Sequence, residues 1–208
     1  LKKKKILVLT QYFWPESFRI NDLALHLEQS GYDVSILTGI PNYPSGKYFS
    51  DYGLFKNRKQ RFKNLKIIRS FLIPRGTSKF QLFLNYLSFS IFASLKIFSF
   101  KEKFDCVFIY APSPILTAIP AVILNKFKNT PSILWISDIW PESIVATIKM
   151  PLIIKKILFK SFNPILKFIY NGCTKILVTS KGFIPLIVNK SISMYKVDYL
   201  PQWAEPFF

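Results

Sequence analysis

Asp138 is the side chain with the clearest potential for acid–base chemistry in this sequence. It ends the apolar segment SILWISD, residues 132–138, which predicts a buried strand. A carboxylate at the end of such a strand can accept a proton or orient a hydroxyl. The same carboxylate could cap a following helix or form a structural ion pair. Ser180 follows a later predicted strand in the same way and suits a helix cap equally well.

The loop after the first predicted strand carries an acid and a base. Glu16 could accept hydrogen bonds from sugar hydroxyls, and Arg19 could pair with a phosphate. The alternative is that both residues cap and pair around the start of the next helix. A dinucleotide-binding loop has glycines here to approach the pyrophosphate, whereas this chain has Trp14-Pro15-Glu16. An NAD or FAD enzyme is therefore not expected.

The loop after the second predicted strand combines rigid prolines with an amide and an aromatic ring. Pro41, Asn42 and Tyr43 stand in the segment GIPNYP, residues 39–44. Amides bond hydroxyl groups and aromatic rings stack on the faces of sugars, so this loop suits a carbohydrate. A purely structural proline-rich turn explains the same residues.

These residues lie in loops between alternating strands and helices. Strands are predicted at residues 5–10, 33–38, 65–70, 105–110, 132–138, 174–179 and 196–200. Helices are predicted at residues 20–30, 78–100, 152–170 and 181–189, with another ending near residue 126, and residues 39–61 are predicted to be a long irregular loop. The alternation predicts an α/β fold: a Rossmann-like, doubly wound, mainly parallel sheet of about seven strands, covered on both faces. Ligands of such sheets lie at the carboxyl ends of the strands, where the loops above begin.

Composition narrows the class of partner. The chain has 208 residues, enough for one domain with a substantial core, and its net charge of +18 favours anionic partners. Only five of the 29 basic residues are Arg, the residue that direct base readout favours, so nucleic acid is not expected as a partner. Cys106, Cys173 and His26 are far apart and no CxxC motif is present, so no metal site is expected. Two reduced thiols suit a cytoplasmic protein.

Seven segments, in order along the chain, resemble the N-terminal domain of the retaining glycosyltransferases of family 4, which have the GT-B fold. The segments are QYFWPE at residues 11–16, FRIND at 18–22, GIPNYP at 39–44, Ser113-Pro114, DIWPES at 138–143, SKGF at 180–183 and LPQWA at 200–204. The similarity covers nearly the whole chain. It is greatest to the subgroup of fucosamine and colanic-acid-type transferases of bacterial surface polysaccharide synthesis.

The resemblance implies that this chain is one half of a GT-B enzyme. Residues 1–200 would form the Rossmann-like N-terminal domain, which binds a glycan acceptor that is often lipid-linked. Residues 201–208 would begin the interdomain linker. A C-terminal domain, absent from this sequence, would bind the nucleotide-sugar donor, and no metal or other cofactor would be required.

For individual residues, the resemblance implies an acceptor site at the carboxyl edge of the sheet, with Asp138 as the candidate catalytic residue. The candidate substrate-binding residues are Glu16, Arg19, Asn21, Pro41, Asn42, Tyr43, Ser113, Trp140, Glu142 and Ser180. The chain departs from the family pattern at Ser137, where relatives have histidine or arginine, and at Gln202, where the linker motif has asparagine. It also lacks a glycine-rich first loop. These departures favour acceptor positioning over catalysis as the role of Asp138.

Two apolar segments raise the question of a membrane. Residues 80–100 are long enough to span one, but Gln81, Asn85 and Lys96 favour a buried or interfacial helix. Residues 152–170 carry four lysines among Ile and Phe, so both segments could dock on anionic lipid; alternatively they pack on the sheet with extended Lys side chains. We therefore expect a cytoplasmic protein, peripheral at the inner face of the cell membrane. The alternative to an enzyme half is a non-catalytic Rossmann-like module that binds an anionic ligand or a membrane surface.

Overall fold

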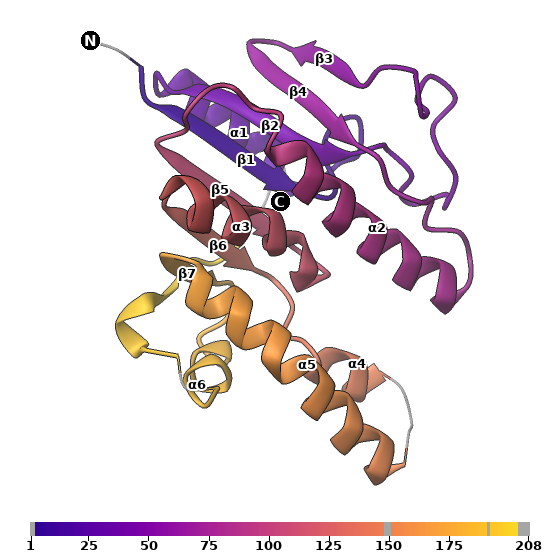
Figure 1. Ribbon diagram of the computed structural model, residues 1–208, viewed down its shortest axis with the longest axis vertical. Coiled ribbons are helices and arrows are strands. Elements are labelled where there is room, and N and C mark those ends of the chain that lie inside the picture. The colour runs from indigo at the N-terminus through magenta and orange to yellow at the C-terminus, as the bar shows by residue number, and fades with distance from the viewer. Residues whose placement is uncertain (1–2, 148–150, 191, 204–208) are drawn as a thin grey trace.

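Eight strands form one sheet in the computed structural model, which describes residues 3–147, 151–190 and 192–203 (Figure 1). Their order across the sheet is β3-β4-β2-β1-β5-β6-β7-β8, and all neighbours are parallel except β3 and β4. The bounds are β1 Lys5–Thr10, β2 Asp33–Gly39, β3 Lys59–Phe62, β4 Leu65–Ser70, β5 Cys106–Ala111, β6 Ser132–Ile136, β7 Lys175–Val178 and β8 Val197–Tyr199. The winding direction reverses between β1 and β5, the place where doubly wound sheets bind ligands.

All seven predicted strands are present, which confirms the predicted Rossmann-like α/β fold class. The eighth strand, β3, begins within residues 39–61, which were expected to form an irregular loop, and ends one residue beyond them. Its sequence KQRF has a single apolar residue, so no hydrophobic run marks it. It forms by antiparallel pairing with β4, with Phe62 opposite Leu65 across a tight turn in which Lys63 has a φ of 52°.

Helices cover the two faces of the sheet unequally. Their bounds are α1 Arg19–Gln29, α2 Lys79–Ile97, α3 Ile119–Lys128, α4 Glu142–Thr147, α5 Leu152–Gly172 and α6 Phe183–Val188. In Figure 1, α2, α3 and α5 lie side by side on the viewer's side of the sheet; with α6 they build one core, which includes Phe89, Leu124 and Ile169. Of the described helices, α1 alone enters the core on the other face, through Ile20 and Ala24.

The long helix α2 is a single helix, where the sequence allowed one helix or two. Ser78 caps it, because its side chain accepts a hydrogen bond from the Gln81 backbone N–H while the Gln81 side chain accepts one from the Ser78 N–H. Tyr86, Phe89 and Ile97 on one side of the helix are buried against the sheet. Among the described helices, α2 is the one whose length and composition would also allow it to cross a membrane.

Helix α4 was not expected from the sequence. The segment that forms it, Glu142–Thr147, is short and is preceded by Pro141, so no helical period is apparent. Its position matters because it begins within the predicted site segment DIWPES, at Glu142.

Candidate functional site

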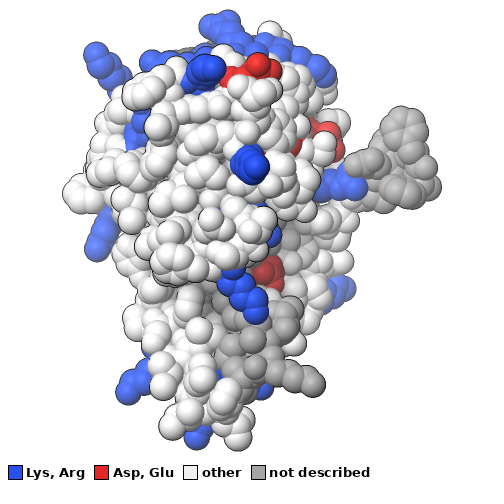
Figure 2. All heavy atoms as spheres, turned by 90° about the vertical axis from the view of Figure 1, so that its right-hand side faces the viewer, with Lys and Arg blue, Asp and Glu red and all other residues white. Residues whose placement is uncertain are grey.

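Four of the motif-bearing loops lie together at the carboxyl edge of the sheet. They follow β1, β2, β5 and β6, and each contains a cis X-Pro bond: Trp14-Pro15, Tyr43-Pro44, Ser113-Pro114 and Trp140-Pro141. Figure 2 views the molecule from the side toward which β1, β2 and β4 point in Figure 1. Most of that surface is uncharged, with Lys and Arg mainly around its outline and few acidic groups. Two cavities open among these loops, one polar and one apolar.

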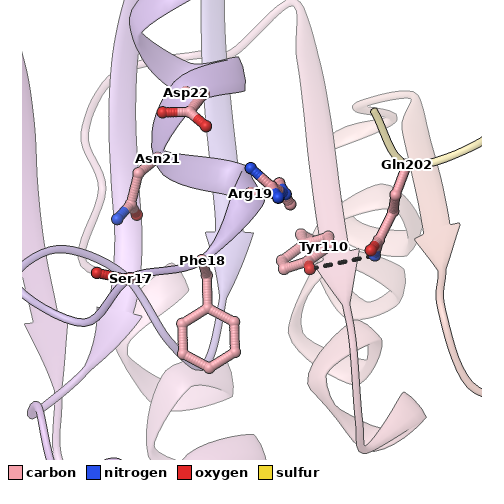
Figure 3. A pocket seen from close by; sticks show the side chains of 7 residues that line it. All are labelled: Ser17, Phe18, Arg19, Asn21, Asp22, Tyr110 and Gln202. Atoms are coloured by element: carbon pink, nitrogen blue, oxygen red, sulfur yellow. Dashed lines mark hydrogen bonds between the residues drawn. The ribbon is translucent and has the colours of Figure 1, made fainter. Parts of the chain in front are cut away.

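The polar cavity, of about 410 Å³, lies where α1 begins (Figure 3). Arg19 extends from the first turn of α1 toward Tyr110 of β5 and Gln202. The Gln202 side-chain amide donates hydrogen bonds to the Tyr110 hydroxyl at 3.5 Å and to Ser137 Oγ at 2.7 Å. Burial raises the pKa of Tyr110, so its hydroxyl stays protonated near neutral pH. Guanidinium, hydroxyl and amide groups together suit a polar ligand such as a phosphate or a sugar.

Residues 200–203 return to the sheet after β8 and bring Gln202 to the polar cavity. The Trp135 indole donates a hydrogen bond to the Leu200 carbonyl at 3.0 Å. The Trp135 and Trp203 rings stack, with centroids 5.5 Å apart and planes 14° apart. The first part of the predicted linker is therefore held against the sheet, and its remainder, residues 204–208, lies outside the described residues.

The apolar cavity, of about 610 Å³, lies between α2 and α5. Its apolar walls come from the two helices: Leu82, Phe83 and Tyr86 of α2, and Leu158 and Phe162 of α5. Its polar lining comes from the motif loops and the start of α2: Lys79, Ser113, Asp138 and Ser143, with the indole of Trp140.

Trp140 fixes the carboxylate of this cavity. Its indole N–H is shared between Asp138 Oδ2 at 3.0 Å and Ser113 Oγ at 3.2 Å. Tyr86 packs edge-on against Trp140, with ring centroids 6.1 Å apart, and burial raises the pKa of Tyr86, so its hydroxyl stays a donor. A carboxylate and neutral hydroxyls in an otherwise apolar cavity can orient, and accept a proton from, one hydroxyl of a largely apolar molecule.

Glu16 has a different place from the one that sugar binding would require. Its side chain is 3% exposed and its carboxylate accepts three backbone N–H groups: from Asn42 at 2.9 Å, Tyr43 at 2.8 Å and Phe13 at 3.3 Å. Burial raises its pKa to about 7, against the opposing effect of these three donors. The geometry therefore makes Glu16 a clamp that joins the loops after β1 and β2.

Asn42 also serves the protein interior. It is fully buried, and its side-chain oxygen accepts hydrogen bonds from the Arg75 backbone N–H at 3.0 Å and from Asn85 at 3.3 Å. Asn85 in turn accepts a hydrogen bond from Gln11 at 2.6 Å. This network joins the loops after β1, β2 and β4 to α2, so the Asn42 amide is occupied within the protein.

Of the remaining residues in these two loops, Tyr43 reaches the surface. Its ring, 38% exposed, packs with Tyr12 and Phe18, and the Arg75 guanidinium lies 5.3 Å from its centroid. Pro41 is buried. The Asn21 side chain bridges its own loop, accepting from the Trp14 N–H at 3.1 Å and donating to the Glu16 carbonyl at 2.8 Å, although it also lines the polar cavity.

Like Glu16, Pro41, Asn42 and Tyr43, the last two predicted residues line neither cavity. Glu142 pairs with Lys190 at 2.5 Å, and its Oε2 is buried without a hydrogen-bond partner among the described residues. Ser180 is exposed and accepts a hydrogen bond from the Gly182 N–H at 3.3 Å, which shapes the turn before α6. The structure thus brings Arg19 and Asn21 to the polar cavity, and Ser113, Asp138 and Trp140 to the apolar one.

Several residues at this edge were missed by sequence reasoning. Arg69, at the end of β4, is 1% exposed and donates hydrogen bonds to the Trp14 carbonyl at 2.7 Å and the Gly39 carbonyl at 3.2 Å. Burial lowers its pKa to about 10, which still leaves it charged near neutral pH. A lone Arg ending an apolar strand is the signal that could have identified it. Tyr86 and Phe162 of the apolar cavity had no such signal, because α2 and α5 are apolar on several sides.

Among the described residues, no three His, Cys, Asp or Glu side chains gather where they could hold a metal ion. Cys106, the first residue of β5, and Cys173, directly after α5, are free thiols. Neither lies at the carboxyl edge, so neither contributes to the two cavities.

Comparison with known proteins finds solved structures of similar fold but no matching sequence family. No protein-family model matches the chain, and no curated protein matches it. Among solved structures, sucrose-phosphate synthase from Thermosynechococcus elongatus shares 11% identity at a TM-score of 0.61, over 98% of this chain and 49% of that one. A second solved chain of that synthase also shares 11% identity, at a TM-score of 0.60; the match spans 98% of this chain and 90% of that one.

Two further structures show the breadth of the fold. The catalytic domain of starch synthase IV from Arabidopsis thaliana, bound to ADP and acarbose, is 10% identical at a TM-score of 0.59, over 97% of this chain and 52% of that one. UDP-N-acetylglucosamine 2-epimerase from Rickettsia bellii is 10% identical at a TM-score of 0.51, over 95% of this chain and 44% of that one. The chain thus spans about half the length of these proteins. Its fold is that of the Rossmann-like domain of GT-B glycosyltransferases.

Proposed function

We propose that this chain is the acceptor-binding half of a glycosyltransferase. The enzyme transfers a sugar from a nucleotide-sugar donor to a lipid-linked glycan acceptor in surface polysaccharide synthesis. The donor is held mainly by a second domain, and the reaction retains the configuration of the sugar. The order of the seven sequence motifs supports family 4, and within it the fucosamine and colanic-acid-type subgroup.

The observation that carries the proposal is the apolar cavity at the carboxyl edge. Its apolar walls suit the lipid portion of an acceptor, and Asp138 stands among them, fixed by Trp140. The departures from the family pattern favoured positioning alone, but a carboxylate so placed can both orient the acceptor hydroxyl and accept its proton as the new glycosidic bond forms. An epimerase of a single UDP-sugar has no acceptor to bind, so this cavity favours transfer over epimerisation.

The polar cavity supplies the second half of the argument. It lies at the switch point of the sheet. Its distance from the apolar cavity is short, since Gln202 of the polar cavity is hydrogen-bonded to Ser137 and the next residue, Asp138, lines the apolar cavity. Arg19 there is suited to a phosphate oxygen of the donor. Donor and acceptor would then meet across the end of β6.

Transfer by the full-length polypeptide tests the proposal. A panel of nucleotide sugars is offered with a polyprenyl-diphosphate sugar as acceptor, and product is followed by chromatography. Asp138→Asn should lower kcat by about 100-fold or more, the usual contribution of a positioned acid or base. Asp51→Asn, on an exposed loop, is the matched control and should leave transfer unchanged.

Two outcomes would contradict the proposal. If no nucleotide sugar supports transfer while the chain still binds an anionic ligand, the non-catalytic binding module becomes the better description. If Asp138→Asn retains full activity, transfer stands but the apolar cavity is not where the acceptor hydroxyl reacts.

A further inference from the structure

An apolar stripe runs along the outer side of α2. Phe83, Leu87, Ile91 and Leu95 follow one another at intervals of four residues, so they lie on one side of the helix, and each is 37–64% exposed. No charged residue interrupts the helix between Lys79 and Lys96. The stripe covers about 18 Å at 1.5 Å per residue, and exposed phenylalanines extend it at both ends of the helix.

A second apolar surface comes from α5. The N-terminal half of α5 extends beyond the sheet in Figure 1. Leu152, Ile153 and Ile157 there are 60–76% exposed, and the exposed Lys156 and Lys160 lie between and after them. An amphipathic helix that only covered the sheet would bury these residues, so this half of α5 is built to contact something else. We call the outer sides of α2 and α5 together the helical surface.

The charge of the helical surface indicates its partner. Neither helix contains Asp or Glu, whereas α5 carries four lysines and α2 has a lysine at each end. Large apolar side chains combined with positive charge alone suit the interface of an anionic bilayer, where apolar groups enter the acyl region and lysines meet the headgroups. A second copy of this chain would bring a further net charge of +18, which opposes self-association there.

The helical surface is continuous with the apolar cavity. Phe83 belongs to the stripe on α2 and also lines the cavity. Leu158 and Phe162 line the opposite wall, on α5. The cavity is therefore bounded by the same two helices whose outer sides are apolar.

We propose that the helical surface lies on an anionic bilayer and that the hydrocarbon chain of the acceptor enters the apolar cavity directly from the bilayer, between α2 and α5. The identity of the acceptor rests on the proposed function, whereas the bilayer contact does not. With this geometry a lipid tail reaches the cavity without crossing water, while its head group points toward Asp138.

Vesicle co-sedimentation tests the bilayer contact, with phosphatidylcholine vesicles that contain or lack phosphatidylglycerol. The chain should bind the anionic vesicles more tightly and lose affinity as salt rises. Removing Lys156 and Lys160 together (K156A/K160A) should weaken binding by about 25-fold, from about fivefold per lysine near the surface. Lys56→Ala with Lys59→Ala removes the same charge elsewhere and is the matched control.

A second matched pair of variants tests the contribution of apolar side chains to vesicle binding. Ile157→Glu places a charge within the helical surface, and Phe55→Glu places one at a 96% exposed phenylalanine on the loop before β3. Both side chains are exposed, so both variants should fold. Vesicle binding should fall at least tenfold for Ile157→Glu alone. Equal losses in the two variants, or no binding by the wild-type chain at low salt, would overturn the bilayer contact.

Trp140 reports whether acyl chains reach the cavity. Of the four tryptophans, Trp140 belongs to the core beside α2 and α5, whereas Trp14 and Trp135 belong to the other face and Trp203 stacks on Trp135. Lipids brominated on the acyl chain should quench part of the fluorescence, and Trp140→Phe should abolish the quenched part. Quenching that persists undiminished in Trp140→Phe, with the fold intact by circular dichroism, would refute entry through the cavity.

A transfer assay separates this inference from the proposed function. In the full-length polypeptide, Ile157→Glu should impair transfer to a long-chain acceptor in vesicles but not to a water-soluble short-chain analogue. Loss of neither activity would refute the route from the bilayer while leaving the transferase standing. Absence of transfer in the wild type, with vesicle binding intact, would refute the transferase and leave the bilayer contact.

Discussion

The buried carboxylate of Glu16 gives the stability of this fold a pH dependence that can be isolated with one substitution. The carboxylate is 3% exposed, and burial raises its pKa to about 7 from an ordinary value near 4.5. The folded state therefore binds this proton more tightly than the unfolded state does. As pH rises from about 4.5 to above 7, the proton is removed and the folded state loses stability relative to the unfolded chain.

The size of the effect follows from the shift. A difference of about 2.5 pKa units corresponds to about 3 kcal/mol at 1.36 kcal/mol per unit, a large part of the stability of a domain. Glu16→Gln removes the titration but keeps one oxygen that can accept from the Asn42 and Tyr43 N–H groups, which share Oε1. The Phe13 N–H loses its acceptor, as it also does when Glu16 is protonated on Oε2.

Urea denaturation followed by circular dichroism at pH 5 and pH 8 measures the effect. At pH 5 the free energies of unfolding of the variant and the wild type should differ by less than about 1 kcal/mol, because in the folded state both side chains are neutral and only the unfolded Glu16 has begun to ionise. At pH 8 the variant should be the more stable, by up to about 3 kcal/mol. Taking the difference between the two proteins at each pH cancels the contributions of all other titrating groups.

Two results would contradict this reasoning. If the difference between variant and wild type is the same at both pH values, the carboxylate does not titrate in this range. If the wild type gains on the variant as pH rises, the three backbone donors and Arg69 outweigh burial and hold the pKa below its ordinary value. Glu16→Ala, which leaves three backbone N–H groups without their acceptor, two of them buried, should destabilise the fold at both pH values by about 2–6 kcal/mol.

Three further predictions use stability and exchange measurements. Ser78→Ala removes the capping box of α2 and should lower the free energy of unfolding by about 1 kcal/mol in urea titrations. Gly172→Ala should cost about 1–3 kcal/mol, because a Cβ there would overlap the Val122 side chain, whereas Gly53→Ala meets no neighbour and should be neutral or slightly stabilising in thermal melts. Trp135→Phe removes the hydrogen bond to the Leu200 carbonyl, so amide hydrogen exchange of residues 200, 202 and 203 should accelerate; unchanged exchange would show that ring stacking alone holds the segment.

The sequence was sufficient to predict the sheet because its central strands are continuous apolar runs. Residues such as those of β1 and β5 are buried on both faces, so their composition is dictated by position alone. β3 was not predicted because an edge strand forms by pairing with its neighbour and needs no apolar run of its own. α4 was not predicted because a helix of six residues after a proline is too short to show a helical pattern of apolar residues. Both elements depend on contacts with other parts of the chain, which the sequence of the segment itself does not show.

The candidate site was predictable in location but not in the direction of its side chains. Strand ends place Glu16, Arg19 and Asp138 at one edge of any doubly wound sheet. Which of them faces a cavity is decided by contacts between loops: Glu16 turns inward because the N–H groups of the next loop need an acceptor. The apolar walls of the cavity could not be predicted for another reason. A helix that is apolar on all sides, as α2 is, has no sequence pattern that shows which side packs on the sheet.

The two ends of the sheet restrict how this molecule can associate with others. β3 has four residues, with Lys59 and Arg61 exposed, and β8 has three, with Asp198 exposed and paired to Lys175 at 2.7 Å. Short, charged border strands resist the addition of a strand from a neighbouring molecule. Molecules that meet at high concentration should therefore not extend one another's sheets, so the protein should not grow into fibrils.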